Sequence, residues 1–140
     1  MMSGIRGKDT KPELIVRSRL HRRGFRYRLH YGDLPGKPDM VFPKYHAVIL
    51  VNGCFWHGHD CHLFKWPSTR AEFWRAKIKS NQVRDARNID AYSTRGWRTL
   101  VIWECALKGR DRKDPDEVAA LAARWLRSKV TTAEIKGKVR

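Results

Sequence analysis

The chain has 140 residues, a length that suits one domain with a substantial core but not two. It carries 30 lysines and arginines against 14 acidic residues, and a net charge of +16 favours a polyanionic partner, most often nucleic acid. No apolar run approaches the ~18 residues of a membrane span, and the N-terminus lacks the apolar segment of a signal peptide. Three cysteines cannot all pair, so reduced thiols in the cytoplasm are expected rather than a disulfide framework. The alternative is a solvated basic surface without a dedicated partner.

The first predicted element is a helix that begins near Thr10. Thr10-x-x-Glu13 is a capping box, Pro12 lies in the first turn, and Gly24 follows the last periodic residue. Alternation over residues 25–29 then indicates a short strand. The apolar side of the helix is expected to bury Leu14, Ile15 and Leu20, with Val16 as a further candidate.

Two apolar runs follow a turn-rich segment and predict a β-hairpin. Residues 40–42 and 47–51 are separated by the short link Pro43-Lys44-Tyr45. The second run is apolar throughout, which is typical of a central strand buried on both faces.

The second half predicts two helices and one strand. Capping boxes at Thr69 and Asp114 open the helices, Gly96 ends the first of them, and residues 97–104 form an apolar strand. Residues 129–140 are expected to be a frayed tail. The prediction is a single α/β domain over 1–140, with a central mixed sheet flanked by helices.

A cluster of metal-binding residue types follows the second apolar run. Cys54, His59 and Cys61 are close in sequence, and Cys105 follows the last predicted strand. Three thiolates and one imidazole suit tetrahedral Zn²⁺, and four protein ligands leave no open position, which predicts a structural site. The alternative is three buried cysteines without a metal.

Three further residues are candidates for catalysis. Asp39, at the start of the hairpin, could bind a divalent cation such as Mg²⁺, and Glu13 could converge on it. His57 lies between the zinc ligands, a rigid position for a general base. Each has a plainer interpretation: Asp39 as a turn residue, Glu13 as part of its capping box and His57 as a surface histidine.

Together these residues resemble the very-short-patch repair (Vsr) mismatch endonucleases of bacteria. The resemblance covers residues 2–110, and its most specific segments are Gly-Cys-Phe-Trp-His at 53–57 and Trp-Glu-Cys-Ala-Leu at 103–107. The other segments that carry it are Arg6-x-Lys8-Asp9-Thr10-x-x-Glu13, Leu34-Pro35-Gly36-Lys37-Pro38-Asp39, Thr69-Arg70-x-Glu72-Phe73-Trp74 and Gly96-Trp97-Arg98.

The resemblance implies a restriction-endonuclease-like fold. It also implies an enzyme that nicks one strand of double-stranded DNA on the 5′ side of a thymine mispaired with guanine, the mispair left when 5-methylcytosine deaminates. Catalytic Mg²⁺, structural Zn²⁺, a location at the bacterial nucleoid and contact with mismatch-repair proteins belong to the same expectation. A monomer is expected, because one off-centre mispair offers no two-fold symmetry.

The family's functional residues map onto named positions here. Asp39 matches the aspartate that binds Mg²⁺, and the residue matching Val51 gives its backbone carbonyl to the same ion. His57 matches the general base, while Glu13 and Asp85 match two further acids, which are expected to orient the histidine or outer-shell waters of the metal. The zinc ligands match Cys54, His59, Cys61 and Cys105, and the aromatic residues that wedge into the base stack match Phe55, Trp56 and Trp74. Core packing is the alternative for Trp74, which also fits the apolar stripe of its helix.

Two features depart from the family pattern. Asn52 stands where the best-known members have a histidine near the scissile phosphate, and asparagine donates a hydrogen bond without carrying charge. Met2 maps near an arm residue that inserts from the minor groove, and family members often have about a dozen more N-terminal residues.

Two other functions compete with this one. A zinc-stabilised basic module could bind distorted DNA without cutting it, and Asn52 is the feature that favours this. A related nuclease could have a different specificity and cut matched DNA. A zinc deaminase fits the sequence poorly, because a Cys3His site has no open position for water and no His-x-Glu precedes a Pro-Cys-x-x-Cys.

Overall fold

The structure is a computed structural model that describes residues 10–139. Met2 and the motif residues Arg6, Lys8 and Asp9 lie outside the described part. The elements follow in the order α2 (Lys11–Arg22), β1 (Met40–Phe42), β2 (Ala47–Asn52), α3 (Ala71–Thr94), β3 (Arg98–Trp103), α4 (Pro115–Arg127) and β4 (Thr132–Ile135), with short 3-10 turns at Pro43–Tyr45 and Glu104–Ala106.

The described strands form one mixed sheet in the order β1-β2-β3-β4. β1 and β2 are antiparallel and make the predicted hairpin, with Val41 opposite Val48. β3 runs parallel to β2, and β4 runs parallel to β3. β2 is therefore an inner strand, as its continuous apolar run predicted.

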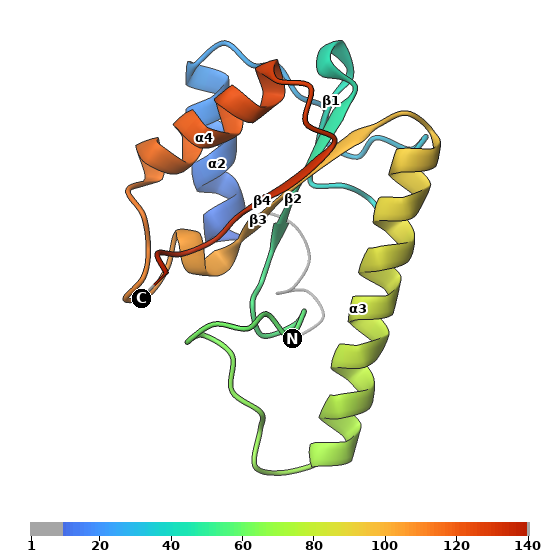
Figure 1. Cartoon of the computed structure of the whole chain (residues 1–140), viewed down its shortest axis with the longest axis vertical. Helices are drawn as coiled ribbons and strands as arrows, with labels where there is room; N and C mark the ends of the chain where they lie inside the picture. Colours follow the sequence, from blue (N-terminus) through green and yellow to red (C-terminus); the bar gives the residue numbers. More distant parts are fainter. Residues whose placement is uncertain (1–9, 140) are drawn as a thin grey trace.

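Helices cover both faces of this sheet. α2 and α4 lie together on one face and α3 lies on the other (Figure 1). Alternate strand residues supply the two cores. Met40, Phe42, Ala47 and Ile49 join α2 and α4, whereas Val41 and Val48 pack with Tyr92 of α3. The fold is the predicted α/β architecture with a flanked central sheet.

Two of the three predicted helix starts are confirmed. The Thr10 side chain accepts a hydrogen bond from the Glu13 N–H, and Asp114 accepts one from the Asp116 N–H at 2.7 Å. The prediction of a capping box at Thr69 is wrong. α3 begins after Arg70, which has φ 53° and makes no capping hydrogen bond with its side chain. Gly96, with φ +83°, follows its last turn as predicted.

The register of α2 differs from the prediction. Leu14 is 47% exposed, while Val16 and Leu20 are buried against the sheet. Glu13 and Arg17 are buried on the same side, because their opposite charges pair over one helical turn. The predicted strand at 25–29 is reduced to one isolated bridge between Arg28 and Val41.

The frayed tail predicted for 129–140 is wrong for its central part. Residues 132–135 form β4, and Ile135 is buried in the core beside α4. The strand was missed because only one of its faces is apolar and its residues are otherwise charged or small. α3 is the longest described helix, yet no described helix has both the length and the apolar character to cross a membrane.

Candidate active site and metal centre

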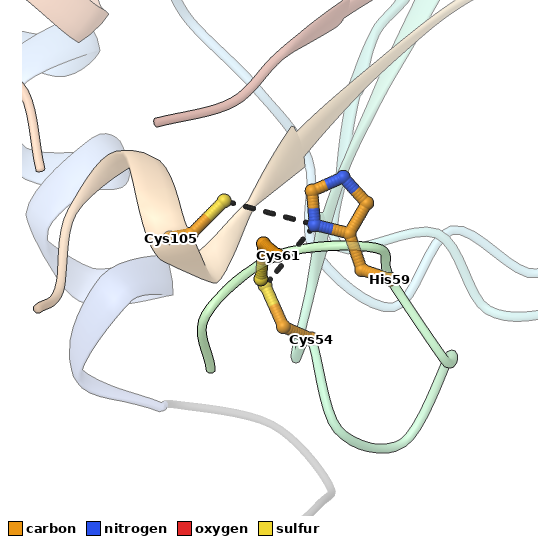
Figure 2. Close-up of side chains that lie close together, drawn as sticks. All are labelled: Cys54, His59, Cys61 and Cys105. Atoms are coloured by element: carbon orange, nitrogen blue, oxygen red, sulfur yellow. Dashed lines mark hydrogen bonds between the residues drawn. The ribbon is translucent and has the colours of Figure 1, made fainter. Parts of the chain in front are cut away.

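The parallel pair β2–β3 brings the candidate metal ligands together. Asn52 at the end of β2 lies opposite Trp103 at the end of β3, so Cys54 and Cys105 leave the sheet at the same edge. The loop after β2 then turns back, and His59 and Cys61 close the group (Figure 2). All four ligand atoms lie within 4.8 Å of one another. The arrangement can hold one metal ion, as the sequence predicted.

The sulfur atoms and the imidazole face a common centre. His59 Nδ1 lies 3.5 Å from Cys54 Sγ and 3.7 Å from Cys105 Sγ. The backbone N–H of Gly137, just after β4, donates to Cys105 Sγ at 3.3 Å. Burial raises the pKa of the Cys54 and Cys105 thiols. A cation at the centre would reverse this shift by stabilising the thiolates.

Asp39 lies where β1 begins and β2 ends. Its Oδ2 accepts a hydrogen bond from the Val51 N–H at 2.7 Å. Burial raises the pKa of Asp39 to about 7, with the Val51 hydrogen bond opposing the shift and the nearby charge of Glu13 adding to it. A carboxylate in this position gains from a nearby cation, because the cation replaces part of the hydration that burial removes.

His57 and Asp85 meet across the gap between the metal loop and α3. His57 Nδ1 pairs with Asp85 Oδ2. If Nδ1–H donates this hydrogen bond to the carboxylate, Nε2 keeps its lone pair and is free to take up a proton. Glu13 and Asp85 were both expected to orient the histidine or outer-shell waters, and the fold brings Asp85 to His57, 28 positions away in the chain.

α3 also holds the backbone of the metal loop. Asn81 donates to the Trp56 carbonyl at 2.8 Å, and Gln82 donates to the His57 carbonyl at 3.1 Å. Gly58 allows this approach, since its φ is +61° and a Cβ there would lie 2.8 Å from Ile78 Cγ2. The loop that carries His57 is thus fixed by the metal ligands on one side and by α3 on the other.

Five of the six candidate residues for catalysis and magnesium binding share one cavity of about 920 Å³. Asp39, Val51, Asn52, His57 and Asp85 all line it. Glu13 does not line the cavity, and its carboxylate pairs with Arg17. The capping-box interpretation of Glu13 is therefore wrong for its side chain, although its N–H caps as expected.

Sequence reasoning missed four polar residues at this site. Asn81 and Gln82 could have been found as amides on the face of α3 that carries Asp85. Glu104 lines the cavity and accepts the Cys54 N–H at 3.0 Å, and Lys108 lies 3.5 Å from the Glu104 carboxylate. Glu104 and Lys108 could have been found from their position at the end of the predicted strand and just after it, close to Cys105 in the sequence.

The three aromatic residues singled out from the sequence form one cluster. The ring of Phe55 lies 5.4 Å from that of Trp56 and 5.3 Å from that of Trp74, and the two tryptophan rings are 5.9 Å apart. All three side chains are only partly buried, and Phe55 and Trp56 line the cavity. Core packing alone does not account for Trp74, because Trp74 belongs to neither of the two hydrophobic cores that pack on the faces of the sheet.

The fold and this site define the class of protein. A mixed sheet presents an acidic residue and a histidine to one cavity beside partly exposed rings, on a chain of net charge +16. Together these features are typical of an enzyme that cuts DNA.

Comparison with known proteins identifies the family. The model of the DNA mismatch endonuclease Vsr family matches residues 1–63. The chain is 41% identical over 134 residues to the DNA mismatch endonuclease Vsr of Escherichia coli, covering 96% of this chain and 86% of that protein. It is 49% identical over 107 residues to a type II nicking enzyme of Xanthomonas oryzae, which covers 76% of this chain and 79% of the relative. A type II nicking enzyme of Neisseria meningitidis is 42% identical over 110 residues, with 79% of each chain covered. The chain belongs to the Vsr family of DNA mismatch endonucleases.

Proposed function

We propose that this endonuclease nicks one strand of duplex DNA on the 5′ side of a thymine mispaired with guanine, and so starts very-short-patch repair of deaminated 5-methylcytosine. The observation that carries the proposal is the shared cavity of Asp39, His57 and Asp85 beside the cluster of Phe55, Trp56 and Trp74. The proposal implies a monomer that works at the nucleoid, where it would meet mismatch-repair proteins.

In this proposal the imidazole of His57 removes the proton from the attacking water. Asp85 accepts a hydrogen bond from Nδ1–H, so Nε2 is the atom that takes the new proton, and the carboxylate stabilises the imidazolium that results. The hydrogen bond from Gln82 to the His57 carbonyl keeps the ring's own backbone from shifting. Asp85 is thus a positioning residue for the histidine.

Asp39 and the Val51 carbonyl are the oxygen donors that would hold Mg²⁺. The Asp39 carboxylate accepts the Val51 N–H, and both residues line the cavity. Oxygen donors of this kind suit the hard cation Mg²⁺, which takes one or two carboxylates and completes its shell with water and phosphate oxygens. Bound there, the ion supplies Lewis-acid stabilisation of the negative charge that develops on the phosphate. Glu13 would act at longer range, since Arg17 holds its carboxylate. Asn52 lines the same cavity and would donate a hydrogen bond to the scissile phosphate.

Zinc is the ion proposed for the cluster of Cys54, His59, Cys61 and Cys105. Ligand bonds of 2.3 Å to sulfur and about 2.1 Å to nitrogen at tetrahedral angles place sulfur about 3.6 Å from nitrogen. The separations of 3.5 and 3.7 Å from His59 Nδ1 to two sulfurs agree with this value. The ion would be structural, tying the loop of His57 to the end of β3.

The ring cluster supplies a physical basis for mismatch selectivity. Inserting Phe55, Trp56 and Trp74 between base pairs requires unstacking, which costs a few kcal/mol per step. A wobble-paired T·G step costs less to open than a matched step, so the same wedge favours the mispair. Insertion of the rings also bends the duplex, and the bend brings more of the basic surface against phosphates.

A strand-labelled duplex with one T·G mispair tests the proposal, with the matched C·G duplex as its control. We expect Mg²⁺-dependent nicking 5′ of the mispaired thymine, and loss of nicking in Asp39→Ala. Tight binding without a nick would indicate the competing function, a basic module that binds distorted DNA without cutting it, which Asn52 favours. Equal cutting of both duplexes would indicate a nuclease of other specificity. Because several relatives are named type II nicking enzymes, the mispair should be placed in several flanking sequences.

A further inference from the structure

A second group of aromatic rings lies beside the three-ring cluster and is not used by the proposed function. Phe64 connects the two groups, with its ring 5.9 Å from Phe55 and 4.8 Å from Trp66. Trp66 is 48% exposed and Phe73 is 46% exposed. The loop before α3 and the first turns of α3 extend beyond the sheet, away from α2 and α4 (Figure 1). These large rings therefore face water on a projecting part of the molecule.

An arginine side chain lies over each of the two exposed rings. The Arg70 guanidinium lies 4.3 Å from the centre of the Phe73 ring, and the Arg75 guanidinium lies 5.1 Å from the centre of the Trp66 ring. Both arginines are exposed, and neither takes part in an ion pair among residues 10–139. A guanidinium that rests flat on a ring keeps the N–H donors at its rim available to another partner.

We infer that Arg70 and Arg75, held over Phe73 and Trp66, bind two backbone phosphates of the duplex that flanks the mispair. The inference rests on the proposed function only in requiring that DNA reaches the three-ring cluster. Phosphate is the partner because guanidinium donors match its oxygens and because the chain's net charge of +16 attracts a polyanion. Continuity through Phe64 places both arginines beside the DNA that the cluster would contact.

The rings make the two contacts stronger than free surface arginines would be. A long side chain loses rotamer freedom when it binds, and a ring that already restricts it reduces this loss. Arg75 reaches Trp66 from α3 across to the loop, so the pair also fixes the loop against the helix. Contacts of this kind position DNA without reading its sequence.

The salt dependence of DNA binding tests the inference. Binding of a T·G duplex and its matched control would be measured without divalent cations at salt concentrations from about 50 to 200 mM. In a plot of log K against log salt, Arg70→Gln and Arg75→Gln should each reduce the slope by about 0.9, which is one phosphate contact. Both duplexes should be affected alike. Arg124→Gln on the exposed side of α4 makes the same charge change on the opposite face and should leave the slope unchanged.

A double-substitution cycle tests the part played by the ring. If Trp66 acts by holding Arg75, the loss of affinity in Trp66→Leu plus Arg75→Gln should be no larger than in Arg75→Gln alone. Additive losses would overturn that role. Slopes that stay unchanged in the arginine variants, or fall equally in Arg124→Gln, would overturn the phosphate contacts. Nicking by the wild type, assayed in parallel, separates the two ideas. If the wild type nicks but the arginine variants keep the wild-type slope, only this inference is refuted. If the variants have reduced slopes but the wild type never nicks, only the proposed cleavage is refuted.

Discussion

At the scale of single residues, the site combines groups that are costly to bury. Asp39 loses hydration in the cavity, and its pKa is raised to about 7. Its ionised form is therefore unfavourable in the folded chain unless a cation lies beside it. The same feature that prepares the carboxylate for a metal ion should lower the stability of the metal-free protein.

The variant Asp39→Asn should be more stable than the wild type at pH 8 in magnesium-free buffer. Between the ordinary pKa of 3.8 and about 7, the folded chain keeps the Asp39 proton while the unfolded chain releases it, so stability of the wild type falls as pH rises. Asparagine does not ionise and can still accept the Val51 N–H. We expect a difference of a few kcal/mol in urea unfolding at pH 8 that vanishes near pH 4. An equal difference at both pH values would contradict this explanation, and nicking should be lost in either case.

The variant Asp85→Asn should separate catalysis from DNA binding. The amide can donate to Nδ1 and stabilise the wrong tautomer of His57, which removes the proton acceptor at Nε2. We expect the nicking rate to fall by about 10²- to 10⁴-fold, with DNA affinity changed less than about twofold. Asp90→Asn, an exposed position on the same helix, is the control. An unchanged rate in Asp85→Asn would remove the histidine–carboxylate pair from the mechanism.

At the scale of elements, α3 is more a support for the site than a part of the core. Ile78, Asn81 and Tyr92 are its only buried residues among the described ones, over a helix of 24 residues. Its polar faces instead hold the loop through Asn81, Gln82 and Asp85. This accounts for the weak apolar stripe in its sequence.

The variant Gly58→Ala should disturb this support. The added methyl group would crowd Ile78 and Gln82, and alanine is strained at φ +61°. Gly96→Ala is a matched control, because its φ is +83° but nothing lies within 4 Å of an added Cβ. We expect both to lose about 1 kcal/mol of stability from the strain, and Gly58→Ala to lose about 1–3 kcal/mol more with a reduced nicking rate. Equal effects on nicking in the two variants would show that the close approach has no functional role.

The last strand should contribute measurably to stability. Ile135 of β4 is buried in the core beside α4, whereas Val139 is 83% exposed. We expect Ile135→Ala to lower the free energy of unfolding by about 2–4 kcal/mol. Val139→Ala should change it by less than about 0.5 kcal/mol. Denaturant unfolding of both variants checks this, and a negligible loss in Ile135→Ala would restore the frayed tail that the sequence suggested.

At the scale of the whole molecule, the metal centre joins segments that are far apart in the chain. Its ligands come from the loop after β2 and from the turn after β3, and Gly137 supports it from beyond β4. The same loop carries His57 and the rings of Phe55 and Trp56. Removing the ion should therefore affect folding and catalysis together.

Metal affinity should increase with pH. Burial raises the pKa of the Cys54 and Cys105 thiols, so both are protonated in the metal-free chain at neutral pH, and binding must release their protons. We expect one zinc ion per chain by mass spectrometry, tighter binding at pH 8 than at pH 6.5 in a chelator competition, and a lower Tm after removal. Cys61→Ala should lose most of the bound zinc. Binding that does not depend on pH would contradict a thiolate site.

The sequence by itself determined the features with local signals: the caps at Thr10 and Asp114, the hairpin, the central strand β2 and the group of Cys54, His59, Cys61 and Cys105 that could hold a metal ion. These depend on neighbours in the chain, on periodicity or on residue type alone. The tertiary structure decided which groups meet. It pairs Asp85 of α3 with His57 in the loop after β2, and it adds the C-terminal segment to the sheet as β4. Each outcome depends on a partner that comes near only when the sheet and its helices pack. Caps, turns and apolar periodicity depend on residues that are close in the chain, whereas burial and pairing between distant residues arise only in the folded chain.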